Sequence, residues 1–345
     1  MSLYSEITEQ PERIESLLVS QKNTVEKIAS AVRERDIEYV FLAARGTSDN
    51  AGRYANYLLG ALNGLPLALA TPSLFTYYKQ PPILKNALVI GISQSGQSPD
   101  IVSVLDEGKK KNCLTLAITN DSRSPLANAA DFILDIKAGK EKAVAATKTY
   151  TTELMSIAML STALNGNKAH WAELAKVPRW MRAMLKHDAL IAQSVERYRY
   201  MDQTVVLGRG FNYSTAFEWA LKLKELAYVK AEPYSSADFQ HGPIAMLESG
   251  FPVLAISPRG KVFESMYGML KRLRKELSAE LVVISNDKKA LSLTNLPLTV
   301  PIDVPEWLSP LVCILPAQMF AYHLTRAKGY NTERPRSIRK VTETK

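Results

Sequence analysis

The feature that most constrains the fold of this chain is a repeated alternation of short apolar runs with longer helical patterns. Each run is rich in β-branched residues and is followed by a polar or glycine-containing turn, as buried parallel strands are. The eight runs lie at residues 39–44, 87–92, 114–119, 132–136, 204–207, 253–257, 281–285 and 298–300. Strands that alternate with helices predict an α/β protein with doubly wound parallel sheets and helices on both faces.

The two halves of the chain also share their turn residues. Arg45-Gly46 follows the first expected strand of one half and Arg209-Gly210 that of the other, an offset of 209 − 45 = 164 residues. Gly96 and Gly260 follow the second expected strands at the same offset, and the pentapeptides AITND and VISND recur at nearly this spacing. The chain is therefore predicted to contain a duplicated domain, with the boundary between residues 171 and 193.

The net charge of +9 is concentrated near the C-terminus, where the last twenty residues hold seven basic and two acidic side chains. The sequence has no helix-turn-helix or RNP pattern and no basic stripe with interleaved aromatic residues, so we expect no nucleic-acid partner. Small anions, especially phosphates, suit this charge better.

Cysteine usage and the N-terminus set the expected compartment. Only two cysteines occur, with no CxxC pair and no Cys/His cluster at metal-ligand spacing, so we expect no metal and no cofactor. The acidic N-terminus is unlike a signal peptide, and no apolar run reaches the roughly 18 residues of a membrane span. A soluble, cytoplasmic protein is expected, without membrane contact.

Two turns have the composition of phosphate-binding loops. The turn SQSGQSPD at residues 93–100 offers three hydroxyls and a glycine before a helix. The turn RGTSDN at residues 45–50 likewise has a glycine followed by hydroxyl residues and helix-capping residues. Backbone N–H groups, short hydroxyl side chains and a helix N-terminus together suit a phosphate, although such turns also serve only to cap helices. Neither turn fits a dinucleotide or P-loop motif, which leaves a phosphorylated small molecule. A third loop, at residues 142–148, has small residues that allow close backbone approach.

Candidate catalytic groups lie in the second half. The helical pattern at residues 215–229 places Glu218, Lys222 and Glu225 at i, i+4 and i+7, within about 60° of arc. An exposed salt-bridged stripe is the usual explanation for such charges, but the other faces are apolar, which favours a stripe that lines a cleft. His241 lies in the loop DFQHGP, where a structural and a functional role are equally open.

Five segments resemble, in this order, the isomerase portion of glucosamine-6-phosphate synthases, a tandem pair of sugar isomerase (SIS) domains: GTSDNAGRYANY, SQSGQSPD, AVAATKTYTTEL, ALKLKELAYVKAEPYSSADFQHGP and ERPRSIRKVTE. The resemblance implies an N-terminal helix with a first flavodoxin-like SIS domain in residues 1–180, a second in 181–330, and a tail in 331–345 that closes the active site. The chain starts with a sequence similar to the start of that portion, so we expect no glutaminase domain.

The resemblance also implies residue roles. Glu225 matches the base that moves a proton between C1 and C2 of the open-chain sugar, and Lys222 and Glu218 match polar residues that orient the sugar and the base. His241 matches the ring-opening acid/base, which the partner subunit contributes in that family, so a homodimer is expected. Lys340 matches a tail lysine thought to form a Schiff base at C2.

The same resemblance assigns substrate binding to a set of loop residues. These are Gly46, Thr47, Ser48, Ser93, Gln94, Ser95, Ser98, Val144 and Ala145. Two positions depart from the family pattern: Arg45 replaces a cysteine, and Ala146 replaces a serine that contacts the sugar.

These observations predict a phosphosugar isomerase that deaminates an amino sugar 6-phosphate, such as glucosamine 6-phosphate, to a ketose 6-phosphate and ammonia. Deamination is favoured because a chain without a glutaminase domain has no built-in ammonia source. A fructosamine-6-phosphate deglycase, a non-catalytic sugar-phosphate sensor, plain aldose-ketose isomerisation and ammonia-dependent synthesis stay open as alternatives. A sensor needs neither a base nor a ring-opening group, so the joint presence of Glu225, His241 and Lys340 argues against it.

Overall fold

The structure is a computed structural model that describes residues 2–340. The chain forms two compact units that interleave along the sequence. The N-terminal unit consists of Glu12–Glu141, Lys148–Lys176 and the tail from Arg339, and the C-terminal unit consists of the residues up to Pro11, Lys142–Thr147 and Val177–Ile338. Each unit is described by itself.

The N-terminal unit is built on a five-stranded, all-parallel sheet with the order β2-β1-β3-β4-β5. Its strands are β1 Tyr39–Ala43, β2 Leu67–Leu69, β3 Ala87–Ser93, β4 Leu114–Thr119 and β5 Phe132–Asp135. Its helices are α2 Gln10–Arg33, α3 Thr47–Asn63, α4 Ser73–Thr76, α5 Pro99–Lys110, α6 Pro125–Ala129, α7 Lys148–Asn165 and α8 Lys168–Leu174.

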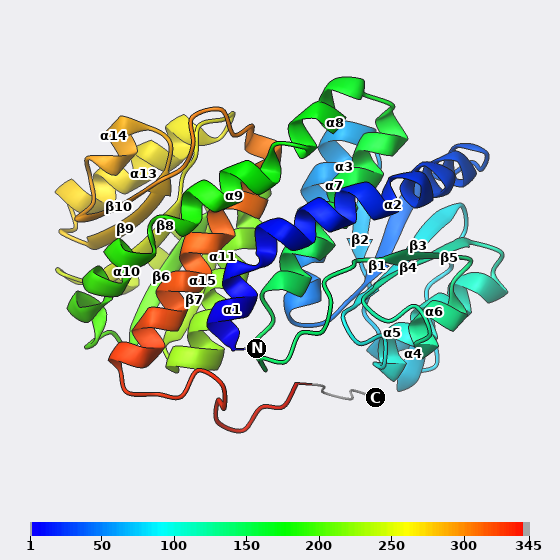
Figure 1. Cartoon of the computed structure of the whole chain (residues 1–345), viewed down its shortest axis with the longest axis horizontal. Helices are drawn as coiled ribbons and strands as arrows, with labels where there is room; N and C mark the ends of the chain where they lie inside the picture. Colours follow the sequence, from blue (N-terminus) through cyan, green and yellow to red (C-terminus); the bar gives the residue numbers. More distant parts are fainter. Residues whose placement is uncertain (1, 341–345) are drawn as a thin grey trace. The chain divides into compact units, whose positions relative to one another are not determined.

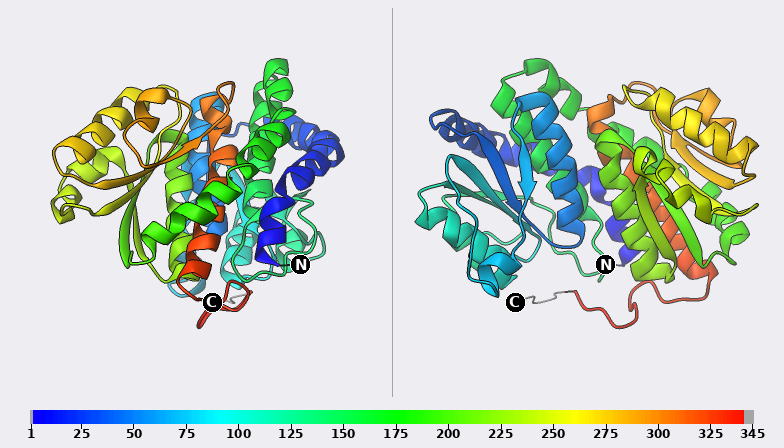
Figure 2. Two further views of the ribbon diagram at one scale, coloured as in Figure 1. Left: turned by 60° about the vertical axis from the view of Figure 1, so that its left-hand side comes forward. Right: turned by 180° about the vertical axis from the view of Figure 1, so that it is seen from behind.

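Helices cover both faces of this sheet, as Figures 1 and 2 show. On one face, alternate strand residues such as Phe41 and Val89 pack in one apolar cluster with Phe75 of α4, Ile101 of α5 and Leu126 of α6. On the other face α3 packs against α7, which is buried along nearly its whole length. Because α7 is surrounded on nearly all sides, its sequence is mostly apolar or small and hydroxylated, and its charged residues Lys148 and Glu153 are buried.

The C-terminal unit repeats this plan with the order β10-β9-β8-β6-β7, again all parallel. Its strands are β6 Gln203–Gly208, β7 Lys230–Ser235, β8 Pro252–Ile256, β9 Glu280–Ser285 and β10 Leu296–Thr299. Its helices are α1 Leu3–Thr8, α9 Val177–Leu185, α10 Asp188–Ser194, α11 Tyr213–Lys222, α12 Ser236–Gln240, α13 Phe263–Lys275, α14 Lys288–Leu291 and α15 Ser309–Ala327, and the π-helix η3 Leu223–Ala227 continues α11.

The helix α13 packs on one face of the second sheet through Met266 and Leu270, against strand residues such as Val253 and Leu281. The helix α11 contacts β6 and β7 and packs against α15, which α1, α9 and α10 contact in turn (Figures 1 and 2). When the strands of each unit are numbered from one in chain order, both sheets have the order 2-1-3-4-5, so the two units share one topology. This confirms the predicted α/β fold of two doubly wound parallel sheets.

All eight predicted strands are present, with ends that differ by at most two residues, but each sheet contains an edge strand that the sequence pattern missed. The strand β2 has only three residues, and β7 has the sequence KAEPYS, with two charges and a proline. Short, charged or proline-containing strands are typical of sheet edges, where they discourage pairing with other chains. An apolar run therefore could not reveal them.

Among the described residues, one helix is long and apolar enough to span a membrane by length and composition, the stretch Glu306–Ala327 that contains α15. The sequence analysis, which counted uninterrupted apolar runs, did not identify it. Within its most apolar window, 89% is buried inside the protein, as in the core helix of a folded domain. This helix is therefore weak evidence for a membrane span.

Candidate functional site

Both predicted phosphate turns leave the first sheet at the same edge. The strands β1 and β3 are parallel neighbours in which Ala43 pairs with Gly91, so the turns that follow them emerge side by side. In the order β2-β1-β3 the chain direction of the connections reverses between β1 and β3. Ligands of doubly wound sheets bind at such a topological switch point, beyond the carboxyl ends of the strands.

An ion pair joins the two turns. The Arg45 Nε donates to Asp100 Oδ2 at 2.8 Å, and the Asp100 side chain is buried while that of Arg45 is half-exposed. Asp100 lies in the first turn of α5, where its other oxygen accepts the Ile101 backbone N–H at 2.9 Å. Arg45, which departs from the family pattern, thus ties the turn after β1 to the turn after β3.

The serines of the second turn shape its backbone. Ser93 Oγ accepts the Gly96 N–H at 3.1 Å, and Ser95 Oγ accepts the Gln97 N–H at 3.3 Å. Ser98 is the N-cap residue of α5, but its hydroxyl makes no capping hydrogen bond among the residues that the structure describes. Its hydroxyl is thus not committed to the cap, which was the structural alternative for this residue.

Gly96 is required for a reason that differs from the expected one. Its φ is +62°, and a Cβ at this position would lie 2.1 Å from Ser124 Oγ and 3.2 Å from Thr119 Oγ1. The neighbouring loop of the same unit therefore excludes a side chain here, whatever a ligand requires. Gly46 has a similar φ of +56°, but a Cβ there would meet nothing within 4 Å.

The first turn leads directly into α3, which begins at Thr47. The Ser48 hydroxyl is buried and donates to Glu153 Oε1 on α7 at 2.9 Å. Gly46 is therefore exposed and Thr47 half-buried, whereas the Ser48 side chain is buried and bonded to α7.

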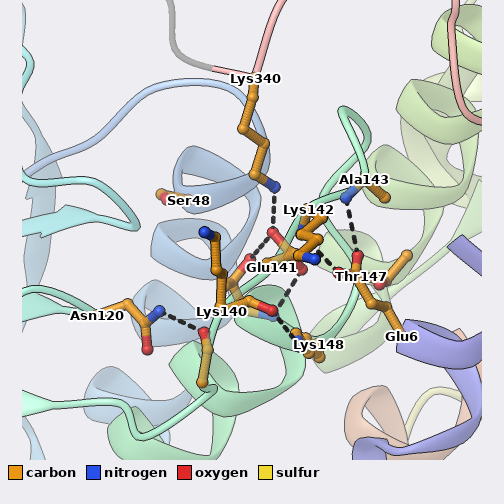
Figure 3. A network of polar contacts seen from close by, with 12 residues as sticks. Glu6, Ser48, Asn120, Lys140, Glu141, Lys142, Ala143, Thr147, Lys148 and Lys340 are labelled. Atoms are coloured by element: carbon orange, nitrogen blue, oxygen red, sulfur yellow. Dashed lines mark hydrogen bonds and ion pairs between the residues drawn. The ribbon is translucent and has the colours of Figure 1, made fainter. Parts of the chain in front are cut away.

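A buried carboxylate organises the segment before α7 (Figure 3). Glu141 accepts the Thr149 N–H at 3.2 Å and the Thr149 hydroxyl at 2.9 Å, and it pairs with Lys340 Nζ at 2.5 Å. The buried Lys148 Nζ donates to the Lys140 carbonyl at 2.8 Å. The tail lysine predicted for catalysis thus contacts a carboxylate that the sequence analysis did not single out.

The third predicted loop is held in the C-terminal unit by another buried carboxylate. Glu6 on α1 accepts the Lys142 N–H at 2.5 Å and the Ala143 N–H at 3.1 Å, and its side chain is buried. Val144 is half-buried and Ala145 is buried. The backbone leading to these two residues is therefore set by α1, as Figure 3 also shows.

The predicted catalytic residues of the second half form one ionic cluster, called here the Lys222 cluster. Lys222 Nζ lies 2.5 Å from Glu225 Oε2 and 3.4 Å from Glu218 Oε1. The side chains of Lys222 and Glu218 are 1% and 0% exposed, whereas that of Glu225 is 24% exposed. The three residues lie together as the spacing predicted. Of the two carboxylates, that of Glu225 is the one that solvent reaches.

The sequence predicted one helix over residues 215–229, but the helix that carries this cluster is not a continuous α-helix. It is α-helical to Lys222, continues as the π-helix η3 over Leu223–Ala227, and ends at Tyr228 in the left-handed conformation, with φ +55°. Short π-helical segments interrupt the regular hydrogen-bond ladder and are frequent at functional sites. Here the change of helix type falls between Lys222 and Glu225.

His241 follows α12 and is exposed, with its backbone N–H bonded to the Asp238 carbonyl at 3.0 Å. No hydrogen bond or ion pair joins its imidazole to another residue within 2–340. The structure thus presents the ring to the outside of the chain and does not bring it to the Lys222 cluster through a direct contact.

The turn of the second unit that corresponds to the serine turn is filled by the protein itself. A Cβ at Gly260 would lie 2.1 Å from Cδ of Glu306, and Glu306 Oε2 accepts the Lys261 N–H at 2.8 Å. A carboxylate of this chain therefore lies where an N–H group of a strand-to-helix turn can meet an anion.

A family model described as the SIS domain matches the chain twice, over residues 35–163 and 199–327. The chain belongs to the SIS domain family. Each match includes one of the two parallel sheets, so the duplication inferred from Arg45-Gly46 and Arg209-Gly210 is a tandem pair of SIS domains.

Curated relatives of this SIS protein are full-length isomerising aminotransferases. The glutamine–fructose-6-phosphate aminotransferase of Thermococcus kodakarensis is 33% identical over 347 residues, which cover 98% of this chain and 57% of that protein. The corresponding enzyme of Gloeobacter violaceus is 35% identical over 321 residues, which cover 88% and 52%. The chain thus spans little more than half the length of these relatives, and corresponds to their isomerase portion.

Solved structures of SIS proteins match over nearly the whole chain. A candidate phosphosugar isomerase from Silicibacter pomeroyi is 30% identical with a TM-score of 0.86, covering 96% of this chain and 99% of that one. The C-terminal domain of the glucosamine-fructose-6-phosphate aminotransferase of Francisella tularensis is 27% identical with a TM-score of 0.85, covering 96% and 98%. Glucosamine-6-phosphate deaminase from Thermotoga maritima, at 22% identity and a TM-score of 0.80, covers 100% of both chains and shares the fold.

The sequence analysis missed the buried carboxylates Glu6, Glu141 and Glu153, and the role of Asp100. Glu141 lies seven residues before the start of α7 (148 − 141 = 7), outside the usual capping positions, so no local signal indicated that it accepts the Thr149 N–H. Glu6, Glu153 and Asp100 bond to residues far away in the sequence, which no local pattern indicates.

Proposed function

We propose that this chain is a phosphosugar isomerase that deaminates an amino sugar 6-phosphate, with glucosamine 6-phosphate as the first candidate. The observation that carries this proposal is the Lys222 cluster, in which a buried lysine holds Glu225 while leaving its carboxylate 24% exposed. A carboxylate fixed on a rigid helix can take a proton from one carbon and return it to the next. The match to aminotransferase isomerase portions and to a candidate phosphosugar isomerase supports the same reaction class.

The proposed reaction begins with ring opening by His241, which the partner subunit of a homodimer would supply. Glu225 removes the proton from C2, the C1–C2 double bond forms, and the C1 carbonyl oxygen takes up a proton to give an enolamine. Glu225 then returns its proton to C1, which leaves an imine at C2. Water adds to C2 and ammonia departs, so that one amino sugar phosphate and one water give one ketose phosphate and one ammonia.

The two turns at the switch point are proposed to bind the phosphate and hydroxyl groups. Gly46 and Thr47 lie at the start of α3, and the serine turn precedes α5, so both present N–H groups at a helix N-terminus. Lys340 is proposed to attack C2 of the imine as an amine, so that ammonia departs at this step and water then releases the lysine amine, with the same overall balance. A cytoplasmic homodimer remains part of the proposal.

The test is a product screen over glucosamine, galactosamine and fructosamine 6-phosphates. Ammonia and a ketose phosphate are expected from glucosamine 6-phosphate, and Glu225→Gln should abolish both, because the amide cannot accept the proton. Glu276→Gln is the matched control, since Glu276 forms an exposed pair with Arg272 on α13. Absence of turnover with every amino sugar phosphate would overturn the proposal. Release of an amino acid from fructosamine 6-phosphates alone would assign a deglycase, and binding without turnover a sensor.

A further inference from the structure

We propose that Glu141 is a positioning residue for Lys340, the buried carboxylate onto which the C-terminal tail docks. The inference rests on the proposed function for what Lys340 does in catalysis, but not for the docking itself. Lys340 Nζ lies 2.5 Å from Glu141 Oε2, across 199 residues of sequence (340 − 141 = 199). Both residues belong to the N-terminal unit. Figure 3 shows the Lys340 side chain pointing toward Glu141.

The position of the Glu141 carboxylate is set independently of the tail. Its two oxygens accept the N–H and the hydroxyl of Thr149, the second residue of α7. The positive end of the helix dipole lies at this helix start and favours a negative charge. Since α7 is an 18-residue helix buried in the unit, the Glu141 carboxylate is bonded to the start of a rigid element.

Burial makes the contact with the tail lysine strong and specific. The side chain of Glu141 is 0% exposed and that of Lys340 is 23% exposed. A carboxylate withdrawn from water is costly to leave without a cation, whereas an exposed ion pair contributes little. In the exposed Lys137–Asp135 pair of the same unit, by contrast, the side chains are 42% and 22% exposed.

In the part of the tail that the structure describes, regular secondary structure does not fix the lysine. Residues 331–340 form neither helix nor strand, and Arg336 is anchored by its N–H, which donates to the Tyr228 hydroxyl at 2.8 Å, and by its guanidinium above that ring. Among the described residues after Arg336, which are residues 337–340, we observe one hydrogen bond or ion pair to a side chain, that of Lys340 with Glu141. Glu141 therefore determines where the Lys340 amine lies.

Amine labelling of the full chain without substrate tests the docking directly. With acetic anhydride as the probe and peptide mass spectrometry as the readout, Glu141→Gln is expected to raise the labelling rate of Lys340 severalfold. Amide hydrogen exchange of Ser337–Lys340 should accelerate in the same variant. Asp135→Asn is the matched control, because it removes the partner of Lys137 and should change Lys137 labelling alone. Unchanged labelling and exchange in a folded Glu141→Gln protein would overturn the inference.

A double-mutant cycle separates positioning from a merely structural role. Glu141→Gln should lower kcat at least tenfold with a smaller change in KM, and should add little when Lys340→Gln is already present. Equal losses in both backgrounds would assign Glu141 a role that does not act through Lys340. If Glu141→Gln does not fold, Lys340→Gln alone should still accelerate exchange of the tail. Absence of turnover in the wild-type protein would overturn the proposed function, while labelling would still decide the docking.

Discussion

Arg45 Nε donates a hydrogen bond to the buried Asp100 carboxylate at 2.8 Å, which joins the turn after β1 to the start of α5. Arg45→Met should leave this carboxylate without its cation and lower the free energy of unfolding by about 1–3 kcal/mol. KM for a sugar phosphate should rise, because the two turns lose their common support. Urea unfolding and steady-state kinetics measure both effects.

The exposed Arg123, in the turn before α6, supplies the control for Arg45. Arg123→Met should change neither the urea midpoint nor KM. If Arg45→Met behaved like this control, the pair with Asp100 would have no part in holding the turns.

Removing the central cation of the Lys222 cluster should destabilise the protein strongly. Lys222→Met leaves the fully buried Glu218 carboxylate without the ammonium at 3.4 Å, which costs about 3–5 kcal/mol for a buried pair. The exposed neighbour Lys224 offers a matched control, since Lys224→Met should change stability by less than about 0.5 kcal/mol. Adding Glu218→Gln to Lys222→Met should restore much of the loss in chemical unfolding experiments. No recovery in the double variant would contradict an electrostatic origin.

The two glycines of the phosphate turns should respond differently to alanine. Gly46→Ala places alanine in open space at φ +56° and ψ −125°, a backbone conformation that side chains rarely adopt, which costs about 1–3 kcal/mol. Gly96→Ala adds a contact of 2.1 Å with Ser124 Oγ to the same strain, so a further loss of about 1–3 kcal/mol is expected. Ser124→Gly should relieve part of the second cost and none of the first. Thermal unfolding of the two glycine variants, each alone and each combined with Ser124→Gly, tests this order.

The stability contributed by Asp49, in the first turn of α3, should depend on pH. Burial raises the pKa of the Asp49 carboxyl above its ordinary value, while Arg53 and Arg45 act in the opposite direction. The unfolded chain therefore ionises Asp49 at lower pH than the folded protein, and stability is lost as pH rises through the folded pKa. Asp49→Asn should stabilise the protein above that pKa and not at more acidic pH. Urea midpoints measured across the acid range would show the opposite trend if the arginines outweighed burial.

Much of the fold could be predicted because buried parallel strands consist of apolar runs, and eight of them are visible in the sequence. The edge strands β2 and β7 could not, since partly exposed strands need no such run. The stripe of Glu218, Lys222 and Glu225 was predictable from helical spacing alone. The change to a π-helix between them was not, because α and π turns differ by one residue and share the same side-chain types.

Long-range polar contacts account for what remained hidden at the site. Glu141 and Lys340 are brought together only by the folded chain, and the same holds for Ser48 with Glu153. A resemblance could assign Lys340 a role, but only the structure shows that its amine contacts Glu141, in the segment before α7. Conversely, Gly96 was predicted correctly as a special position but for ligand approach, whereas Ser124 is what excludes a side chain.

Glu306, packed against Gly260 and bonded to the Lys261 N–H, has a consequence for how the two SIS domains can change. In the first domain, the serine turn is proposed to bind a molecule that comes from solution. In the second domain, the equivalent turn contacts the Glu306 carboxylate, which belongs to the same polypeptide. Substitutions in the second turn are therefore expected to act on folding, whereas substitutions in the serine turn are expected to act on the proposed ligand binding as well.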